Sequence, residues 1–152
     1  MRAEKLLKKK YSMDLPSLKP GGTYNLTAKT GNLIYVSGQI PKRENGELLF
    51  KGRVGQELSI EDGQKAACYA MLNCLGALKG FLEDLDKIKQ VVQVIGYVRS
   101  ADGFGEQTLV MNGASQMLLD IFGDRGGHTR LALGVNELPK GAPVEIQCIV
   151  EV

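Results

Sequence analysis

The strongest constraint on the fold of this chain is a β-strand pattern at residues 89–98, whose core reads VVQVIGYV. Apolar residues occupy consecutive positions there, so both faces of the predicted strand are apolar. Residues 33–36, which read LIYV, show the same pattern. Strands of this kind are typical of a sheet that is covered on both sides. The fold must therefore supply two layers of cover.

Two amphipathic helices are predicted to form one of these layers. Ser59 followed by Ile-Glu-Asp resembles a capping box, and helical apolar spacing then continues to about Leu82. A second helix carries an apolar stripe up to Phe122 and is expected to stop at Gly123. Apolar spacing also predicts a short helix in the first eleven residues.

Five strands complete the predicted architecture, and Gly31 and Asn32 favour a hairpin between the first two. The strands are expected at residues 24–29, 33–38, 89–98, 130–135 and 144–150. The fold class is therefore α+β, in the order β-β-α-β-α-β-β, with the helices on one face of the sheet. We expect one domain over residues 1–152, in which residues 1–20 form the short helix and an irregular lead-in.

The second face of the sheet needs another source of cover, because two helices can cover only one face. Apolar side chains on the other face would otherwise meet water, and their burial is worth about 25 cal/mol per Å². A second copy of the chain is the simplest cover. We therefore expect a homo-oligomer with a pocket at the seam between subunits.

Arg130 lies in the stretch that most strongly suggests a binding site. From this residue on the strand alternates, with apolar side chains on one face and a guanidinium beside two small residues on the other: Leu131, Leu133 and Val135 against Arg130, Ala132 and Gly134. A planar guanidinium left open by small neighbours suits bidentate recognition of a carboxylate or phosphate. We interpret Arg130 as the anchor of a small-anion pocket. The alternative is an ordinary surface ion pair.

The charge balance argues against a dedicated nucleic-acid binder. Nineteen Lys and Arg residues against seventeen Asp and Glu residues give a formal charge of +2, which is far from a strong basic excess. The apolar runs are too short to span a bilayer, and the N-terminus lacks an apolar segment like a secretion signal. We expect a cytoplasmic protein, with neither nucleic acid nor a membrane as its partner.

No metal or cofactor site is predicted. His128 is the only histidine, no Cys pair has zinc-knuckle spacing, and neither a P-loop nor a complete dinucleotide fingerprint occurs. A Ser-His-Asp nucleophile would need His128, and no Gly-x-Ser-x-Gly supports it, so we interpret His128 as a loop or supporting residue. The remaining candidates are an arginine, a phenol, an amide and two small residues, which suit the orientation of a small acid and a water: Arg130, Tyr24, Gln147, Ser37 and Gly38.

Four segments of the chain resemble the RidA/YjgF family of reactive-intermediate deaminases, also called the L-PSP endoribonuclease family. The chain is similar to a longer branch of that family, with an extra N-terminal helix. The resemblance runs from about Gly22 to Val152. It rests on residues 22–24 (GTY), 31–41 (GNLIYVSGQIP), 129–135 (TRLALGV) with 138–139 (LP), and 144–146 (VEI).

The resemblance implies a chorismate-mutase-like subunit assembled as a homotrimer, with clefts between subunits. It implies hydrolysis of enamines and imines such as 2-aminoacrylate and 2-iminobutyrate to 2-oxo acids and ammonia, as in a 2-iminobutanoate/2-iminopropanoate deaminase, without a cofactor. Arg130 would bind the substrate carboxylate and Tyr24 would line the pocket. Ser37 and Gly38 would form the strand end at the cleft, and Asn112 would lie near it.

Two positions depart from the family pattern as we align it. Ala132 stands where the family usually has a cysteine, and Gln147 stands where a glutamate orients the attacking water. A neutral amide can hold a water but cannot accept its proton. We nevertheless expect Arg130, Tyr24 and Gln147 to be the catalytic group, with backbone groups near Ser37 and Ala132 also contacting the substrate.

Two other functions remain open at this point. The loss of a carboxylate at Gln147 favours a non-catalytic trimer that binds or senses 2-oxo acids through the same cleft. RNA cleavage is the third candidate, because the family has also been given that activity, although the near-neutral charge argues against it.

Overall fold

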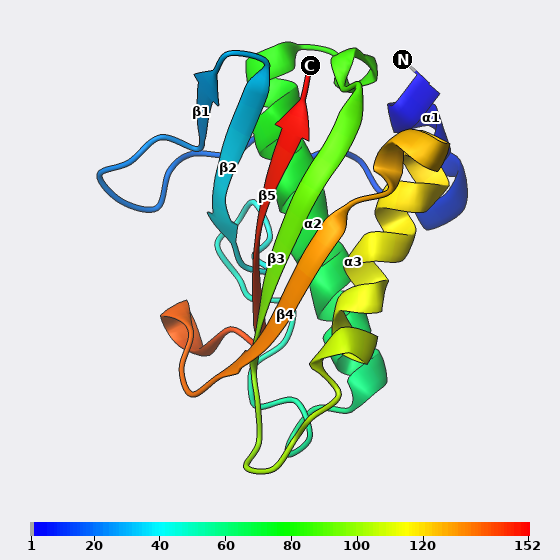
Figure 1. Cartoon of the computed structure of the whole chain (residues 1–152). Helices are drawn as coiled ribbons and strands as arrows, with labels where there is room; N and C mark the ends of the chain where they lie inside the picture. The colour runs from blue at the N-terminus through cyan, green and yellow to red at the C-terminus, as the bar shows by residue number, and fades with distance from the viewer. Residues whose placement is uncertain (1) are drawn as a thin grey trace.

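The computed structural model describes residues 2–152, and these residues form one five-stranded sheet with helices on one face (Figure 1). The strand order is β1-β2-β5-β3-β4, and every neighbouring pair is antiparallel except β3 and β4. The strands are β1 (Thr27–Thr30), β2 (Leu33–Gln39), β3 (Gln90–Arg99), β4 (Thr129–Val135) and β5 (Val144–Glu151). The helices are α1 (Arg2–Tyr11), α2 (Ile60–Leu82) and α3 (Gln107–Phe122). The predicted α+β order is confirmed.

The ends of the two long helices follow from local sequence, as predicted. The Asp62 amide donates to Ser59 Oγ, and the Ser59 amide donates to the Asp62 carboxylate, both at 3.0 Å. This reciprocal capping box satisfies two amides at the start of α2 that would otherwise lack partners. At the end of α3, Gly123 has a φ of 62° and a ψ of −136°, a positive-φ conformation that a glycine adopts without steric cost.

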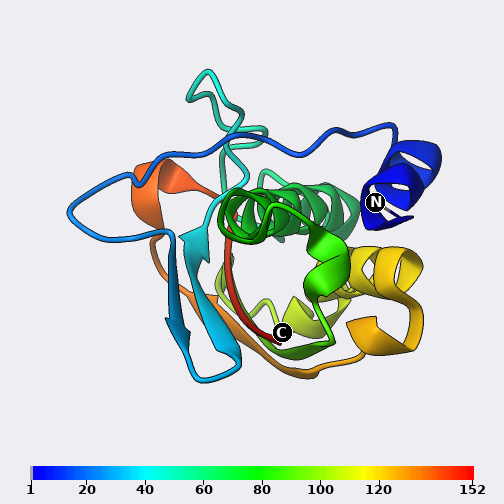
Figure 2. The ribbon, with the colours of Figure 1, turned by 90° about the horizontal axis from the view of Figure 1, so that it is seen from above.

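The core lies between α2, α3 and one face of the sheet. Alternate residues of β5 point into it, and α2 is buried along most of its length. The helix α1 packs on the outside of α3, where Ala3 and Leu7 are buried. Figure 2 shows the lead-in passing from α1 across α2 toward β1. The contact is close at Gly76, where a Cβ atom would lie 2.6 Å from the Pro16 carbonyl oxygen.

The apolar face of β4 points away from the helices. The alternation is present, but Leu131 and Leu133 point away from the helices and remain 49% and 41% exposed. Arg130 pairs with Val94, a fully buried residue of β3, so its side chain lies on the helix side of the sheet. The expectation that small neighbours leave Arg130 open is therefore wrong, because α3 covers that side.

The first strand begins later than predicted. Residues 24–29 were expected to be extended, whereas β1 covers Thr27–Thr30 and Tyr24 lies in a bend before it. The hairpin turn at Gly31, with a φ of 55°, is as expected. Tyr24 is therefore free of the pairing that a strand residue would have, and its ring is placed by loop contacts.

The sheet face opposite the helices carries apolar side chains with no cover from residues 2–152. Tyr35 on β2 and Leu131 and Leu133 on β4 are exposed, and Ile95 on β3 and Ile149 on β5 are partly exposed. This is the uncovered face that the sequence predicts, and it is apolar enough to favour association. No helix among the described residues is long and apolar enough to cross a membrane.

Replacing Gly113 with alanine is expected to lower the free energy of unfolding by about 1–3 kcal/mol, because overpacking forces backbone shifts. Gly113 lies where α3 crosses α2, and an added Cβ atom would fall on the Gln64 carbonyl. Urea unfolding at fixed protein concentration measures the change. Gly80→Ala is the matched control, since nothing lies within 4 Å of the position that its Cβ atom would take. That variant should be stabilised by about 0.5–1 kcal/mol, and equal effects at both positions would contradict this account of the crossing.

Candidate functional site

The guanidinium of Arg130 is held against α3 by neutral groups. Its Nη1 donates to Asn112 Oδ1 at 3.0 Å and to Ser115 Oγ at 2.9 Å. Its Nη2 donates to the Thr108 carbonyl oxygen at 3.2 Å. One face of α3 therefore fixes the plane of the guanidinium and its position over the edge strand β4.

The positive charge of Arg130 has no carboxylate partner within residues 2–152. A guanidinium has five N–H groups, and the three hydrogen bonds above use both on Nη1 and one on Nη2. The groups left are one on Nε and one on Nη2, two adjacent nitrogens that can bind both oxygens of a carboxylate. The alternative of an ordinary ion pair for Arg130 is not supported.

A histidine supports this arrangement from behind. His128 Nδ1 lies 2.7 Å from the Gly126 carbonyl oxygen, and Nε2 lies 2.9 Å from Ser115 Oγ. A carbonyl oxygen only accepts, so Nδ1 is assigned the proton and neutral Nε2 accepts the Ser115 hydroxyl hydrogen. Ser115 Oγ then accepts from Arg130. His128 thus orients the hydroxyl that holds the guanidinium, in keeping with a supporting role.

Two other predicted residues, Tyr24 and Gly38, line a separate pocket of about 570 Å³. Tyr24, Gly38 and Glu145 line it together, and Asn73 of α2 forms part of its wall. The Tyr24 hydroxyl oxygen accepts from the Gly21 amide at 3.1 Å, which fixes the ring across the bend before β1. This hydroxyl retains its own hydrogen for donation to another group.

A bulge in β2 makes room for Glu145. The pairing of β2 with β5 shifts between Val36 and Gln39, so Ser37 and Gly38 form an irregular strand end. Bulges of this kind redirect side chains next to binding sites. A Cβ atom on Gly38 would lie 2.6 Å from Glu145 Oε1. A glycine at this position therefore lets the carboxylate lie against the strand.

Glu145 is electrostatically unusual. Its carboxylate has no hydrogen bond or ion pair with any residue of the described chain, and partial burial raises the pKa of this group above the ordinary value. A carboxylate with a raised pKa is a better proton acceptor than an ordinary one. Glu145 was not predicted as a site residue, although it is the only charged residue at positions 144–150 of the mostly apolar strand β5.

Three predicted contact residues lie beside these groups rather than in the pocket. Ser37 Oγ donates to the Asn25 carbonyl oxygen at 2.6 Å, and Ala132 packs on the helix side of β4. Gln147 shares the open face of β5 with Glu145 but does not line the pocket. The residue that meets Tyr24 and Gly38 is therefore Glu145, two positions before Gln147.

The guanidinium of Arg130 and the carboxylate of Glu145 do not meet within one chain. Glu145 is on the open face of β5, whereas Arg130 is on the helix side of β4, and β3 lies between these strands. Adjacent strands are about 4.8 Å apart, so the sheet separates the guanidinium from the carboxylate. The predicted site is present as two halves.

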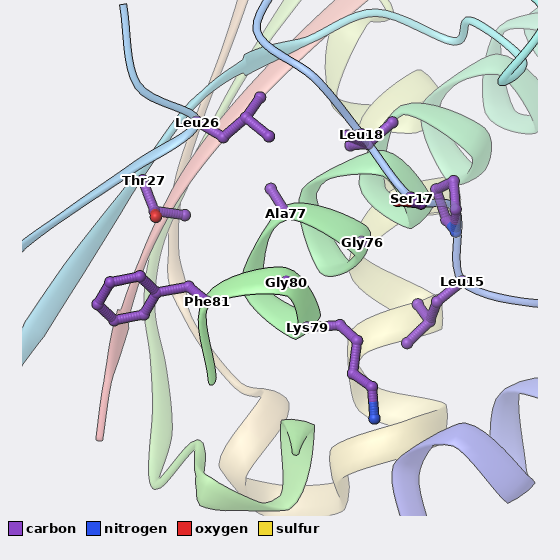
Figure 3. Close-up of a pocket in the computed structure, with 11 residues that line it drawn as sticks. Leu15, Ser17, Leu18, Leu26, Thr27, Gly76, Ala77, Lys79, Gly80 and Phe81 are labelled. Carbon is purple, nitrogen blue, oxygen red and sulfur yellow. The ribbon is translucent and has the colours of Figure 1, made fainter. Parts of the chain in front are cut away.

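A second groove lies away from these residues and is mainly apolar. This groove of about 430 Å³ between the lead-in, the end of α2 and the start of β1 is lined mainly by apolar side chains (Figure 3). Its one cation, Lys79, is paired with Glu4 at 2.6 Å. In the part of the chain that the structure describes, no three His, Cys, Asp or Glu side chains are arranged to hold a metal.

Known proteins share this fold along nearly the whole chain. Residues 10–151 match the model of a family described as YjgF/chorismate mutase-like, a description that also names an unproven endoribonuclease activity. Protein TCP17 of Trypanosoma cruzi is 39% identical over 133 residues, which are 87% of this chain and 82% of that protein. A RutC family protein of Sulfurisphaera tokodaii is 28% identical over 86% of this chain and 89% of its own length.

Two solved structures agree closely with this one. The protein Atu1372 from Agrobacterium tumefaciens, of unknown function, has a TM-score of 0.92 and 38% identity, covering 99% of this chain and 92% of that one. An endoribonuclease candidate from Shewanella oneidensis MR-1 has a TM-score of 0.94 and 27% identity over the whole of both chains. The chain therefore belongs to the YjgF/chorismate mutase-like family, which is the RidA/YjgF family that its sequence resembles.

Proposed function

We propose that the protein is a hydrolytic deaminase of small enamine and imine acids, of the 2-aminoacrylate and 2-iminobutyrate class. It acts at clefts between subunits of a homotrimer. The observation that carries the proposal is the Arg130 guanidinium, which is fixed by neutral partners and keeps two adjacent N–H groups without a partner within residues 2–152. Such a group binds a substrate carboxylate with charge-assisted hydrogen bonds.

The second half of the site supplies the chemistry in this proposal. Glu145 accepts a proton from a water as the water oxygen adds to the imine carbon, and it passes that proton to the imine nitrogen to give a carbinolamine. The hydroxyl proton of the carbinolamine then moves through Glu145 to the nitrogen as the carbon–nitrogen bond breaks and the carbonyl forms. 2-Aminoacrylate enters this sequence as its imine tautomer. The products are a 2-oxo acid and ammonia. Tyr24 donates its hydroxyl hydrogen to the reacting group. The role first assigned to Gln147 moves to Glu145, whose raised pKa suits a proton acceptor.

The homotrimer explains how two separated halves form one site. The open face of the sheet and the exposed Leu131 and Leu133 on the edge strand are available to a second copy. In such an assembly the Arg130 half of one subunit meets the Glu145 half of its neighbour. Sites formed at subunit seams are a common arrangement for small-molecule pockets.

Mixing two inactive variants tests this proposal directly. Arg130→Met and Glu145→Gln each leave one half intact, and each alone should release little ammonia from 2-aminoacrylate. If the halves come from different subunits, co-refolded mixed trimers should recover up to about one quarter of the wild-type rate, the random share of clefts with both halves intact. The control is a chain that carries both substitutions, which should show no recovery when it is refolded alone.

The outcomes separate the parts of the proposal. Wild-type protein without turnover of either imine would reject the deaminase. Turnover without complementation, with monomeric protein by light scattering, would reject the shared cleft. A non-catalytic sensor of 2-oxo acids would bind oxo acid in calorimetry without releasing ammonia. That alternative rested on the missing carboxylate at Gln147, and Glu145 removes its main support.

A further inference from the structure

Four cationic side chains line the pocket that contains Glu145. They are Lys19 from the lead-in, Lys42 and Arg43 from the segment after β2, and Lys140 from the turn before β5. Three separate segments of the chain thus converge on one cavity. A run of neighbouring lysines on a solvated surface would not show this convergence.

These cations are not neutralised by the chain. None of the four has an ion pair or a side-chain hydrogen bond within residues 2–152. The only carboxylates on the pocket wall are Glu44 and Glu145, so four positive and two negative charges leave an excess of two positive charges. A cavity with an excess of positive charge on its wall concentrates anionic ligands.

The backbone is constrained at two of these cationic residues, Lys42 and Lys140. Asn73 Nδ2 donates to the carbonyl oxygens of Ile40 and Lys42, both at 2.8 Å, and so ties the Lys42 backbone to α2. Asn73 Oδ1 is buried without a donor in the described chain. Lys140 has a φ of 59°, a left-handed conformation that is strained for a residue with a side chain. Strain of this kind is concentrated at functional sites.

We propose that this pocket binds a second anionic group of the substrate, so that the preferred substrates are dicarboxylic 2-imino acids such as 2-iminoglutarate and 2-iminosuccinate. This inference rests on the proposed deaminase function. The neighbour's Arg130 binds the carboxylate next to the imine, and the lysines bind the distal one. A volume of about 570 Å³ is ample for a four- or five-carbon acid. Water adds to the imine carbon, ammonia leaves, and a 2-oxo dicarboxylate is formed without any oxidant.

Matched imines test the inference. Amino-acid oxidases with catalase generate 2-iminoglutarate from glutamate, and they generate 2-iminopentanoate, a five-carbon analogue without the distal carboxylate, from norvaline. The rate at which each imine is lost, corrected for spontaneous hydrolysis, gives kcat/KM. We expect kcat/KM for the dicarboxylic imine to be about tenfold higher or more, because one additional charge-assisted hydrogen bond contributes a factor of this size. The preference for the dicarboxylic imine should weaken in roughly 0.5 M salt, because the Debye length is then only a few ångströms and exposed charges are screened from one another.

Lysine variants decide whether the pocket causes the preference. A double variant that carries Lys42→Met and Lys140→Met should bring the ratio of kcat/KM for 2-iminoglutarate to kcat/KM for 2-iminopentanoate close to one. The control Lys29→Met, on the exposed strand β1, should keep the ratio. An unchanged ratio in the double variant would overturn the inference, as would equal turnover of both imines by the wild type, and both results leave the deaminase intact. Failure to hydrolyse either of these imines, with 2-aminoacrylate still turned over, would overturn the inference alone, whereas failure on 2-aminoacrylate and 2-iminobutyrate as well would overturn the deaminase with it.

Discussion

Arg130→Met is expected to lower kcat/KM for 2-aminoacrylate and 2-iminobutyrate by about 10²- to 10⁴-fold, because two charge-assisted hydrogen bonds at about 1.5–3 kcal/mol each are lost. Methionine keeps an unbranched chain over β4 but removes the guanidinium that Asn112 and Ser115 hold. The change should appear mainly in KM if the carboxylate is bound equally in the ground state and the transition state. Steady-state ammonia release measures both constants.

Arg130→Lys separates the charge from the geometry. A lysine keeps the positive charge but cannot present two adjacent donors to one carboxylate. It should recover only part of the lost kcat/KM, and less if α3 no longer fixes its position. Ser115→Ala should have a smaller effect than either, since Asn112 and Thr108 still hold the guanidinium. A folded Arg130→Met protein with wild-type turnover would show that the carboxylate binds elsewhere.

Glu145→Gln is expected to lower kcat by about 10²-fold or more, the usual contribution of a positioned general base. The wild-type rate should fall as the pH drops through the raised pKa of Glu145, because the protonated carboxyl group cannot accept a proton. This acid limb should disappear in the variant. Gln147→Ala is the control, since Gln147 shares the strand face but lies outside the pocket. A larger loss in Gln147→Ala than in Glu145→Gln would return the catalytic role to Gln147.

The same substitution should stabilise the fold near neutral pH. A carboxyl group whose pKa is raised on folding binds its proton more tightly in the native state, so its contribution to stability is present at low pH and is lost as the pH rises through the folded pKa. Glutamine has no charge to desolvate. Thermal unfolding at pH 7 should therefore show a higher Tm for Glu145→Gln than for the wild type, and the difference should shrink as the pH falls through the raised folded pKa and disappear below the ordinary pKa of a glutamate. A lower Tm at pH 7 would contradict burial as the cause of the pKa shift.

The helices were predictable because their signals are local. The Ser59 capping box and the glycine at position 123 act within a few residues of chain. The late start of β1 was not predictable in this way. Asn25 and Leu26 instead meet the bulge in β2, where the Ser37 hydroxyl donates to the Asn25 carbonyl oxygen and the Ser37 amide donates to the Leu26 carbonyl oxygen, and no local pattern in residues 24–26 encodes that bulge.

The candidate site was also predictable only in part, because its local features are visible in the sequence and its contacts between distant segments are not. Arg130 was identified from its small neighbours on β4, yet the sequence did not show that α3 holds its guanidinium through Asn112 and Ser115. Glu145 was missed in favour of Gln147, because both project from the same face of β5 and only the bulge at Gly38 selects between them.

By itself the sequence determined the order of elements and the uncovered apolar face, and it singled out Arg130 as the candidate anchor for an anion. These follow from periodicity and residue type, which act along the chain. Only the tertiary structure decided that Arg130 and Glu145 lie on opposite sides of the sheet and that four cations line the pocket beside Glu145. Strand order and the direction of each side chain are set by packing between distant segments, and no local pattern encodes them.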